Sequence, residues 1–360
     1  MSVPSPIVLT IEPKERGATL VSTALISEQP MLLDPESPPS NWEYSKSKFK
    51  FIDLFAGIGG MRIAFESVGG TCVFTSEWDA NAQKTYEANF GDTPDGDITK
   101  VNEKNIPDFD VLLAGFPCQP FSSIGQREGF KHKTQGTLFY DVLRIIEHKR
   151  PSSFLLENVK GLVSHDSGNT LKIIIESLVS IGYQVQYKVL DAADFGVPQF
   201  RKRIYIVGFD SSKFQGGAKF YWPKPSNKKV GIGKFIESNV EDHSISKHLQ
   251  KSYLNKIADG RPQIVTPESD FPVKTLVSTY HKIQRLTGTF VQDGPTGVRL
   301  LTANECKAIM GFPKSFKIPV SRTQMYRQMG NSVAVPVVKA VAKEINATLL
   351  SAKLVKKASK

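Results

Sequence analysis

The sequence predicts an α/β protein built on a doubly wound, mostly parallel sheet, together with a smaller, loop-rich domain. Two observations lead to this prediction. Short apolar runs typical of buried strands alternate with helical stretches from residue 49 onward. The alternation weakens between about residues 209 and 298, where Gly, Pro, Lys and Ser are frequent, and helical stretches return after it.

The first predicted elements form a strand, a tight turn, a helix and a second strand. They are the apolar run FKFIDLF (49–55), the Gly-rich AGIGG, the helical MRIAFESVG (61–69) and the apolar run CVFTSEW (72–78). The pattern continues with strands at 110–117 and 153–159 and a helix between them. Because right-handed crossovers bring the carboxyl ends of parallel strands to one edge, residues that follow these strands should meet there.

The later elements complete this pattern. A helix at 169–182 precedes two strand-like runs, YQVQYKVLDA and RIYIVGF. In LLTANECKAIMGFP, Thr302 is a candidate N-cap with Glu305 three residues on, which is the signature of a capping box. A last helix covers 333–354. The predicted divisions are 1–48, a Pro-bearing extension expected to be poorly ordered; 49–208, the main α/β domain; 209–298, the loop-rich domain; 299–348, which completes the main domain; and 349–360, a basic tail.

Charge and composition favour a folded protein with an acidic polymer as its partner. Of 360 residues, 40% are hydrophobic, as in ordinary globular proteins, and 46 Lys and Arg against 35 Asp and Glu give a net charge of +11. Residues 199–260 hold twelve basic and five acidic side chains, which makes them a candidate phosphate-facing surface. A merely solvated surface is the alternative.

Compartment and metal content are also constrained by the sequence. No run of about 18 apolar residues and no signal-peptide pattern occurs, so we expect a cytoplasmic protein without a membrane partner. The cysteines Cys72, Cys118 and Cys306 are far apart and show no zinc-ligand spacing. We therefore predict no metal, while a single reactive thiol stays open.

The Gly-rich turn is a candidate nucleotide site. Phe55, Gly57 and Gly59 lie between a strand and a helix, where glycines let a ligand approach the backbone. Glu77 and Trp78 end the next strand, where a carboxylate could bind ribose hydroxyls and an indole could stack on adenine. With Asp97 nearby, so many acids disfavour a diphosphate. A sulfonium ligand, S-adenosylmethionine, fits better than NAD, and a purely structural turn is the alternative.

Three further motifs point to chemistry at the same edge. Cys118 lies in the loop FPCQPFS after a strand, and the polar, Gly-containing stretch after it has the character of a closing lid. A free thiol titrates near about 8.5, so Cys118 needs a partner or a favourable field to react as thiolate. Glu157 ends the next strand, and Arg201 and Arg203 precede RIYIVGF. An inert thiol, a helix cap and a solvated basic cluster are the alternatives for these motifs.

Taken in order, these motifs resemble a known family. FxGxGG, Glu77-Trp78, GDI, the PCQ loop, ENV, QxRxR and the late Gly330-Asn331-Ser332-Val333 resemble the DNA (cytosine-5) methyltransferases of bacterial restriction-modification systems, over residues 49–346. The resemblance implies a Rossmann-like S-adenosylmethionine-dependent methyltransferase fold. It also implies that 49–208 is the catalytic and cofactor-binding domain and 209–298 the target-recognition domain.

The resemblance further implies a mechanism and a set of site residues. Cys118 would add to C6 of a flipped-out cytosine, Glu157 would contact N3 and the exocyclic amine, and Arg203 and Arg201 would hold the base. Thr275-Leu276 is similar to the short Thr-Leu signature of family recognition domains. The implied DNA-binding residues are Gln119, Ser122, Arg203 and Thr275. The implied cofactor-binding residues are Phe55, Gly57, Gly59, Glu77, Trp78, Asp97, Ile98, Pro117, Leu138, Asn331, Ser332 and Val333.

The expected partner is double-stranded DNA, methylated by a monomer that leaves S-adenosylhomocysteine. A cognate restriction endonuclease would act on the same site without a stable complex. Three alternatives stay open: methylation of tRNA cytosine, a catalytically silent DNA-binding protein, and a nicotinamide oxidoreductase, which the absence of a regularly spaced GxGxxG turn disfavours.

Overall fold

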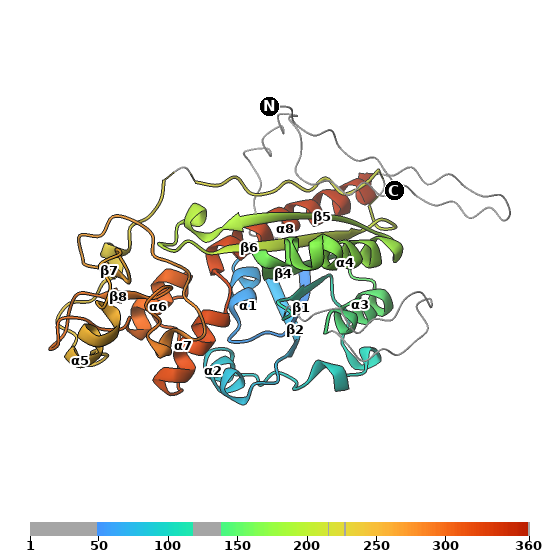
Figure 1. Cartoon of the computed structure of the whole chain (residues 1–360). Coiled ribbons are helices and arrows are strands. Elements are labelled where there is room, and N and C mark those ends of the chain that lie inside the picture. The colour runs from blue at the N-terminus through green and yellow to red at the C-terminus, as the bar shows by residue number, and fades with distance from the viewer. Residues whose placement is uncertain (1–48, 118–137, 215, 227, 359–360) are drawn as a thin grey trace, which may run out of the picture.

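A six-stranded sheet forms the centre of the protein, with strand order β2-β1-β3-β4-β6-β5 (Figure 1). The computed structural model describes residues 49–117, 138–214, 216–226 and 228–358. All strands but β6 run in the same direction, because β1 pairs in parallel with β2 and β3, β3 pairs in parallel with β4, and β6 is antiparallel to both its neighbours. The predicted, mostly parallel sheet is thus confirmed. Its strands are β1 (Phe49–Leu54), β2 (Gly70–Ser76), β3 (Val111–Ala114), β4 (Ser153–Val159), β5 (Tyr183–Asp191) and β6 (Lys202–Asp210).

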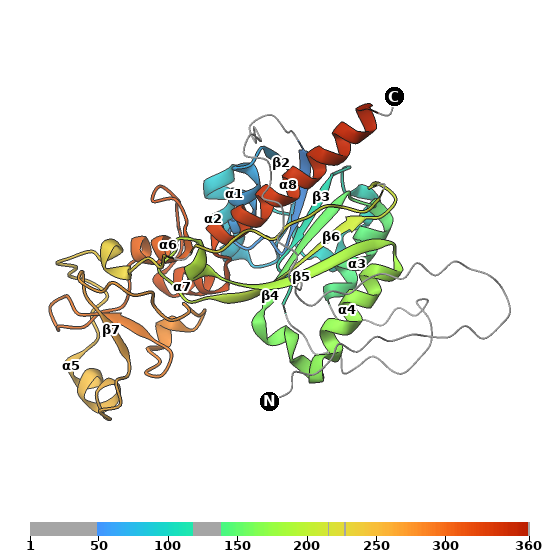
Figure 2. The same ribbon diagram turned by 90° about the horizontal axis from the view of Figure 1, so that it is seen from above.

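Helices cover both faces of the sheet (Figure 2). Successive side chains of a strand point to opposite faces, so alternate residues belong to two cores. Phe51 of β1 packs with α1 (Gly60–Glu66) and α8 (Val335–Ala358), whereas its neighbour Ile52 packs with α3 (Leu138–Lys149) and α4 (Asn169–Ser180). Both faces are therefore buried, which explains why β3 is apolar throughout and β4 is apolar in its central Phe154, Leu155 and Leu156. This is the doubly wound arrangement that the alternation of strands and helices predicts.

Two helices have no counterpart among the predicted elements. They are α2 (Ala80–Phe90) and α7 (Arg322–Asn331). Only Ala82, Thr85 and Tyr86 are buried in α2, and the buried apolar residues of α7, which are Met325, Tyr326 and Met329, stand among polar ones. The N-cap residue of each helix was the sequence signal that could have predicted it. The Asp79 side chain accepts hydrogen bonds from two backbone N–H groups of α2, both at 2.9 Å, and Ser321 caps α7.

Residues 211–298 contain little regular structure. They include a small parallel pair, β7 (Gln263–Val265) with β8 (Thr289–Val291), and the short helix α5 (Lys247–Leu249). Figures 1 and 2 show these elements gathered with α6 (Ala303–Met310) and α7 at one end of the molecule, beside the sheet. The domain boundaries stay predictions. Residues 1–48 lie outside the described residues, and α8 continues as a helix through Ala358, past residue 349.

No helix in the described part of the chain is both long and apolar enough to span a membrane. Over the same residues, no group of three or more His, Cys, Asp or Glu side chains could hold a metal ion.

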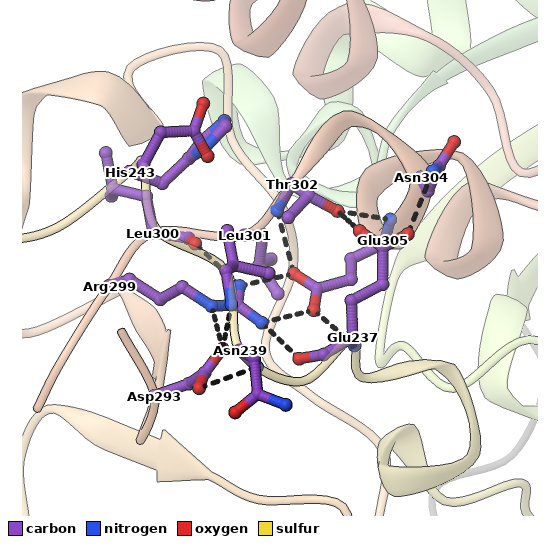
Figure 3. A network of polar contacts seen from close by, with 12 residues as sticks. Glu237, Asn239, His243, Asp293, Arg299, Leu300, Leu301, Thr302, Asn304 and Glu305 are labelled. Carbon is purple, nitrogen blue, oxygen red and sulfur yellow. Dashed lines mark hydrogen bonds and ion pairs between the residues drawn. The ribbon is translucent and has the colours of Figure 1, made fainter. Parts of the chain in front are cut away.

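A buried ion-pair network joins the loop-rich segment to α6 (Figure 3). Arg299 is fully buried and places its two terminal nitrogens on the Glu305 carboxylate, at 2.9 and 2.8 Å. Its Nε donates to Asp293 at 2.8 Å, and Nη2 also donates to the backbone carbonyl of Glu237 at 2.6 Å. Such a paired, fork-shaped contact uses the planar guanidinium in full.

Backbone N–H groups also donate hydrogen bonds to the two carboxylates of this network, Glu305 and Asp293. Glu305 accepts from the N–H of Thr302 at 2.7 Å, which completes the predicted capping box of α6, and from the N–H of Glu237 at 2.9 Å. Asp293 is partly desolvated, which alone would raise its pKa, but hydrogen bonds from Arg299 and from nearby backbone N–H groups lower that pKa to about 2. The network therefore fixes where the chain leaves and rejoins the main domain.

We expect Arg299→Met to lower the free energy of unfolding by about 3–5 kcal/mol, because Glu305 would stay buried without its cation. Urea denaturation followed by circular dichroism measures this change. Arg327→Met, the same substitution at an exposed position of α7, should change stability by less than about 0.5 kcal/mol. Equal losses in the two variants would contradict the role given to the network.

Candidate active site

The turn between β1 and α1 requires left-handed backbone at three positions. Phe55, Gly57 and Gly59 have φ values of +57°, +56° and +84°. A Cβ on Gly59 would lie 2.2 Å from a ring carbon of Phe90, so this position has no room for a side chain. A Cβ on Gly57 would meet no atom within 4 Å, so the backbone there faces open space. The turn therefore offers a ligand direct access to main-chain atoms.

Glu77 holds this turn from the end of β2. Its carboxylate accepts hydrogen bonds from the backbone N–H groups of Gly57 and Asp79, each at 2.8 Å. Burial raises the pKa of Glu77, while these two N–H groups act to lower it. Each carboxylate oxygen keeps a second lone pair for a ligand hydroxyl. The next side chain, Trp78, is 80% exposed, so its indole face is free to stack on a planar ring.

The segment that contains Asp97 runs beside the end of β2. The N–H of Glu77 donates to the carbonyl of Asp95 at 2.7 Å. Asp97 caps a short 3-10 turn by accepting from the N–H and the hydroxyl of Thr99, and these bonds lower its pKa. The side chain of Ile98 is buried in the α3/α4 core. The structure thus brings Asp97 to the edge where Glu77 lies.

The end of α7 meets the turn from another direction. A Cβ on Gly60 would lie 2.9 Å from Ser332 Oγ and 2.9 Å from a Val333 methyl carbon, so the side chains of Ser332 and Val333 pack directly against the Gly60 backbone. Asn331 is exposed, Ser332 is half-buried and Val333 is buried. The predicted cofactor residues of the turn, of β2 and of α7 are therefore close in space although they are far apart in sequence.

The remaining predicted cofactor residues flank a part of the chain outside the described residues. Pro117 is exposed after β3, and Leu138 begins α3 and is half-buried. Cys118, Gln119 and Ser122 lie between them, outside the described residues. The last strand residues before Cys118 run beside β4, where Asn158 donates to the carbonyl of Phe116 at 2.9 Å.

Glu157 and Arg203 form an ion pair at the carboxyl edge of the sheet. Arg203 Nε lies 3.3 Å from Glu157 Oε1, and both side chains are largely buried. Burial raises the pKa of Glu157, while Arg203 and Arg201 act to lower it. A Cβ on Gly115 would lie 3.8 Å from the other Glu157 oxygen, so this carboxyl lies beside the end of β3. A carboxyl of this kind can exchange a proton near neutral pH more readily than an exposed one.

Arg201 is buried behind this pair and binds backbone carbonyls. Nη1 donates to the carbonyl of Leu276 at 3.1 Å, and Nη2 donates to the carbonyls of Gly330, at 3.0 Å, and Ser332. Burial, aided by Arg203 and opposed by Glu157, lowers the pKa of Arg201 to about 9, so the guanidinium is charged at neutral pH. Arg201 therefore ties the Thr-Leu segment to the end of α7, and any contact with substrate stays a prediction.

Thr275 lies beside the start of β6, where its hydroxyl donates to the carbonyl of Phe200 at 2.6 Å. The hydroxyl proton is thus used within the protein, and the oxygen remains available as an acceptor.

The chain matches the family model described as C-5 cytosine-specific DNA methylase over residues 49–347. It belongs to this family. The chain is therefore a DNA (cytosine-5) methyltransferase, as the order of its motifs predicts.

Individual relatives agree with this assignment. The methyltransferase is 61% identical over 303 residues to type II methyltransferase M.MspI of a Moraxella species, covering 84% of this chain and 72% of the relative. It is 59% identical over 309 residues to M.BsuFI of Bacillus subtilis, covering 85% of this chain and 75% of the relative. Among solved structures, a Spodoptera frugiperda DNMT2 mutant has a TM-score of 0.67 at 23% identity, covering 81% of this chain and 97% of that one. The last similarity concerns the fold.

Two buried residues of the site, of which the first belongs to the QxRxR motif, received no role in the sequence analysis. Gln199 accepts from the N–H of Leu276 at 2.7 Å and donates to the carbonyl of Ile309 at 2.8 Å, so it supports the same segment as Arg201. Asp53 is buried within β1, and its Oδ2 has no hydrogen-bond partner among the described residues. Burial raises the pKa of Asp53 to about 8, with Arg62 opposing this shift and Glu77 adding to it. A lone acid inside the apolar run FKFIDLF was the available signal.

The two turn glycines should differ in their tolerance of a side chain. We expect Gly59→Ala to lower the free energy of unfolding by about 1–3 kcal/mol more than Gly57→Ala, because only the first Cβ collides with Phe90. Both variants bear the cost of a left-handed backbone, about 1–2 kcal/mol. Urea denaturation of the two variants in parallel measures the difference, and equal stability would exclude a tight contact at Gly59.

Asp53 should make the stability of the methyltransferase depend on pH. Its native pKa is raised, so between about pH 4 and about pH 8 the native state holds a proton that the unfolded state has lost. Stability therefore falls as pH rises through this window. We expect Asp53→Asn to flatten the fall when urea denaturation is compared at about pH 5 and about pH 8, whereas Asp108→Asn, at an exposed carboxylate, should leave the slope unchanged.

Proposed function

We propose that this methyltransferase transfers a methyl group from S-adenosylmethionine to C5 of a flipped-out cytosine in a specific duplex DNA sequence, through a covalent adduct between Cys118 and C6. The observation that carries the proposal is the buried Glu157–Arg203 pair at the carboxyl edge, beside the strand that leads to Cys118. A carboxyl with a raised pKa next to a guanidinium can bind the hydrogen-bonding edge of a base.

The residues at the Gly-rich turn fit S-adenosylmethionine. Open space at Gly57, the exposed Trp78 indole and the Glu77 carboxylate offer room for the ligand, a stacking face for adenine and acceptors for ribose hydroxyls. Asp97 adds negative charge, which favours a cationic ligand over a diphosphate. When bound, S-adenosylmethionine supplies an electrophilic methyl group on a positively charged sulfur.

The side chains of this chain would prepare the cytosine for that methyl group. The Cys118 thiolate forms a bond to C6, which makes C5 electron-rich. Glu157 donates a proton to N3 as the ring takes up negative charge, and Arg203 holds the base carbonyl. After methylation, a base removes the C5 proton, the C6–S bond breaks with its electron pair returning to sulfur, and N3 gives its proton back to Glu157. Because none of these groups can reach a stacked base, the cytosine must leave the duplex.

The names of the relatives support a biological role. M.MspI and M.BsuFI are called type II methyltransferases, so we propose that this chain is the modification enzyme of a restriction-modification system. A cognate endonuclease would act on the same DNA site without a stable complex. We further propose that the enzyme acts as a monomer, without a metal, in the cytoplasm, and that it releases S-adenosylhomocysteine.

We expect Cys118→Ala to abolish methyl transfer while S-adenosylmethionine still binds, because the thiol acts on the base and not on the cofactor. Glu157→Gln should lower the transfer rate by about 10²–10⁴-fold for loss of an acid catalyst. Transfer of radiolabelled methyl groups measures the reaction, and isothermal titration calorimetry measures S-adenosylmethionine binding.

Duplex DNA that contains 5-fluorocytosine should form a covalent complex with the native enzyme, since fluorine cannot leave as a proton does. Turnover by Cys118→Ala would refute the mechanism.

Parallel methyl-transfer assays with duplex DNA and with tRNA test which nucleic acid is the substrate. Methyl transfer to duplex DNA alone is the expected result, and transfer to tRNA alone would contradict the proposed substrate. Sequencing of methylated cytosines in DNA from cells that express the enzyme then identifies the recognition site.

A further inference from the structure

A hollow of about 810 Å³ opens beside the active site, and three lysines and two aspartates, Asp191 and Asp194, are among the residues that line it. We call it the basic hollow; Lys160, Lys202, Lys229 and Phe200 are among its lining residues. Val159 of β4 pairs with Arg203 of β6, so Lys160 and Lys202 lie one residue beyond this pair on neighbouring strands. The basic hollow therefore shares the sheet edge that carries Glu157 and Arg203.

Two of the three lysines have no partner within the described part of the chain. Lys229 forms an ion pair with Asp194. Asp191 lies opposite Lys202 in the sheet, but its carboxylate accepts from the backbone N–H groups of Arg201, at 2.9 Å, and Ala193, at 3.3 Å. The side chains of Lys160 and Lys202 are exposed, and neither ammonium group forms a hydrogen bond or ion pair with a described residue; the Arg203 guanidinium binds only the backbone carbonyl of Lys202. Their charges are therefore available to an anion in the hollow.

The hollow also displays an aromatic ring whose backbone is fixed. Phe200 is 45% exposed, although its N–H donates to the carbonyl of Val273 at 2.9 Å and its carbonyl accepts from the Thr275 hydroxyl at 2.6 Å. Lys229 Nζ lies 5.9 Å from the ring centroid. An exposed ring with a fixed backbone, in the same hollow as the unpaired Lys160 and Lys202, offers apolar contact to a ligand that also carries negative charge.

We propose that the basic hollow binds the sugar-phosphate backbone of the DNA strand that carries the target cytosine. Lys160 and Lys202 contact phosphates, and Phe200 packs against the adjoining deoxyribose or base. This inference rests on the proposed function. Each strand of duplex DNA carries one phosphate per about 3.4 Å of helix axis, so a cytosine delivered to Glu157 brings phosphates to the same sheet edge. Binding there would hold the strand while the base leaves the stack.

The test is the salt dependence of DNA binding by the full-length double variant Lys160→Gln/Lys202→Gln. The probe is a duplex that carries the recognition site found by sequencing, with affinity measured by fluorescence anisotropy at several NaCl concentrations. Each lost phosphate contact lowers the slope of log affinity against log salt by about 0.9, so the slope should fall by about 1.8. If the two proteins converge at about 1 M salt, this slope corresponds to about 30-fold weaker binding at about 0.15 M. The KM for DNA should rise while kcat at saturating DNA stays within about twofold.

Lys50→Gln is the matched control, because Lys50 is exposed at the start of β1, on the opposite edge of the same sheet. It should leave the slope and KM unchanged. A double variant with the slope of the native enzyme, or with a change no larger than that of Lys50→Gln, would overturn the assignment. Phe200→Ala should weaken binding without altering the slope, since an apolar contact releases no counterion. Glu157→Gln should lose methyl transfer and keep the slope, which separates failure of the hollow from failure of the proposed chemistry.

Discussion

The reversal of a single strand determines where the polar side chains of the site lie. Because β6 is antiparallel to β4, its first residues lie at the edge where β4 ends, and Arg203 reaches Glu157. Nine residues of extended chain span about 30 Å, so a parallel β6 would place Arg201 and Arg203 at the far edge of the sheet. The ion pair, the links from Arg201 to α7 and the position of Lys202 beside Lys160 all depend on this one choice of direction.

Much of the fold follows from the sequence, because buried parallel strands and amphipathic helices have strong periodic signals. The strand at 153–159 and the capping box of α6 were predicted residue for residue. The direction of β6 was not, since antiparallel and parallel strands buried on both faces have the same apolar pattern. Helix α2 was missed because it buries few apolar residues and depends on tertiary contacts, such as the 2.9 Å bond between Thr85 and Gln328. Helix α7 was missed because its buried Met325, Tyr326 and Met329 stand in a mostly polar stretch.

The residues of the site that belong to sequence motifs could be predicted. The contacts that depend on how distant segments pack could not. The order of the motifs gave the family, and Glu157 and Arg203 meet as the resemblance implied. Nothing in the sequence shows that the Glu77 carboxylate binds the N–H of Gly57, or that Gln199 holds Leu276, because these partners are 20 and 77 residues apart and one atom of each pair is backbone. Such contacts depend on where the elements pack, which single-sequence patterns do not encode.

Four of the contacts by which the main domain holds the loop-rich segment are made to its main chain. Arg201 and Gln199 bind the carbonyl and the N–H of Leu276, and Arg299 and Glu305 bind the carbonyl and the N–H of Glu237. A backbone amide is the same whichever side chain it carries, so these anchors place little demand on the residues between them. Segments of different sequence could therefore be held by the same four side chains. If the segment between the anchors reads the DNA sequence, as the family resemblance implies, its residues can change while the chemistry at the sheet edge stays intact.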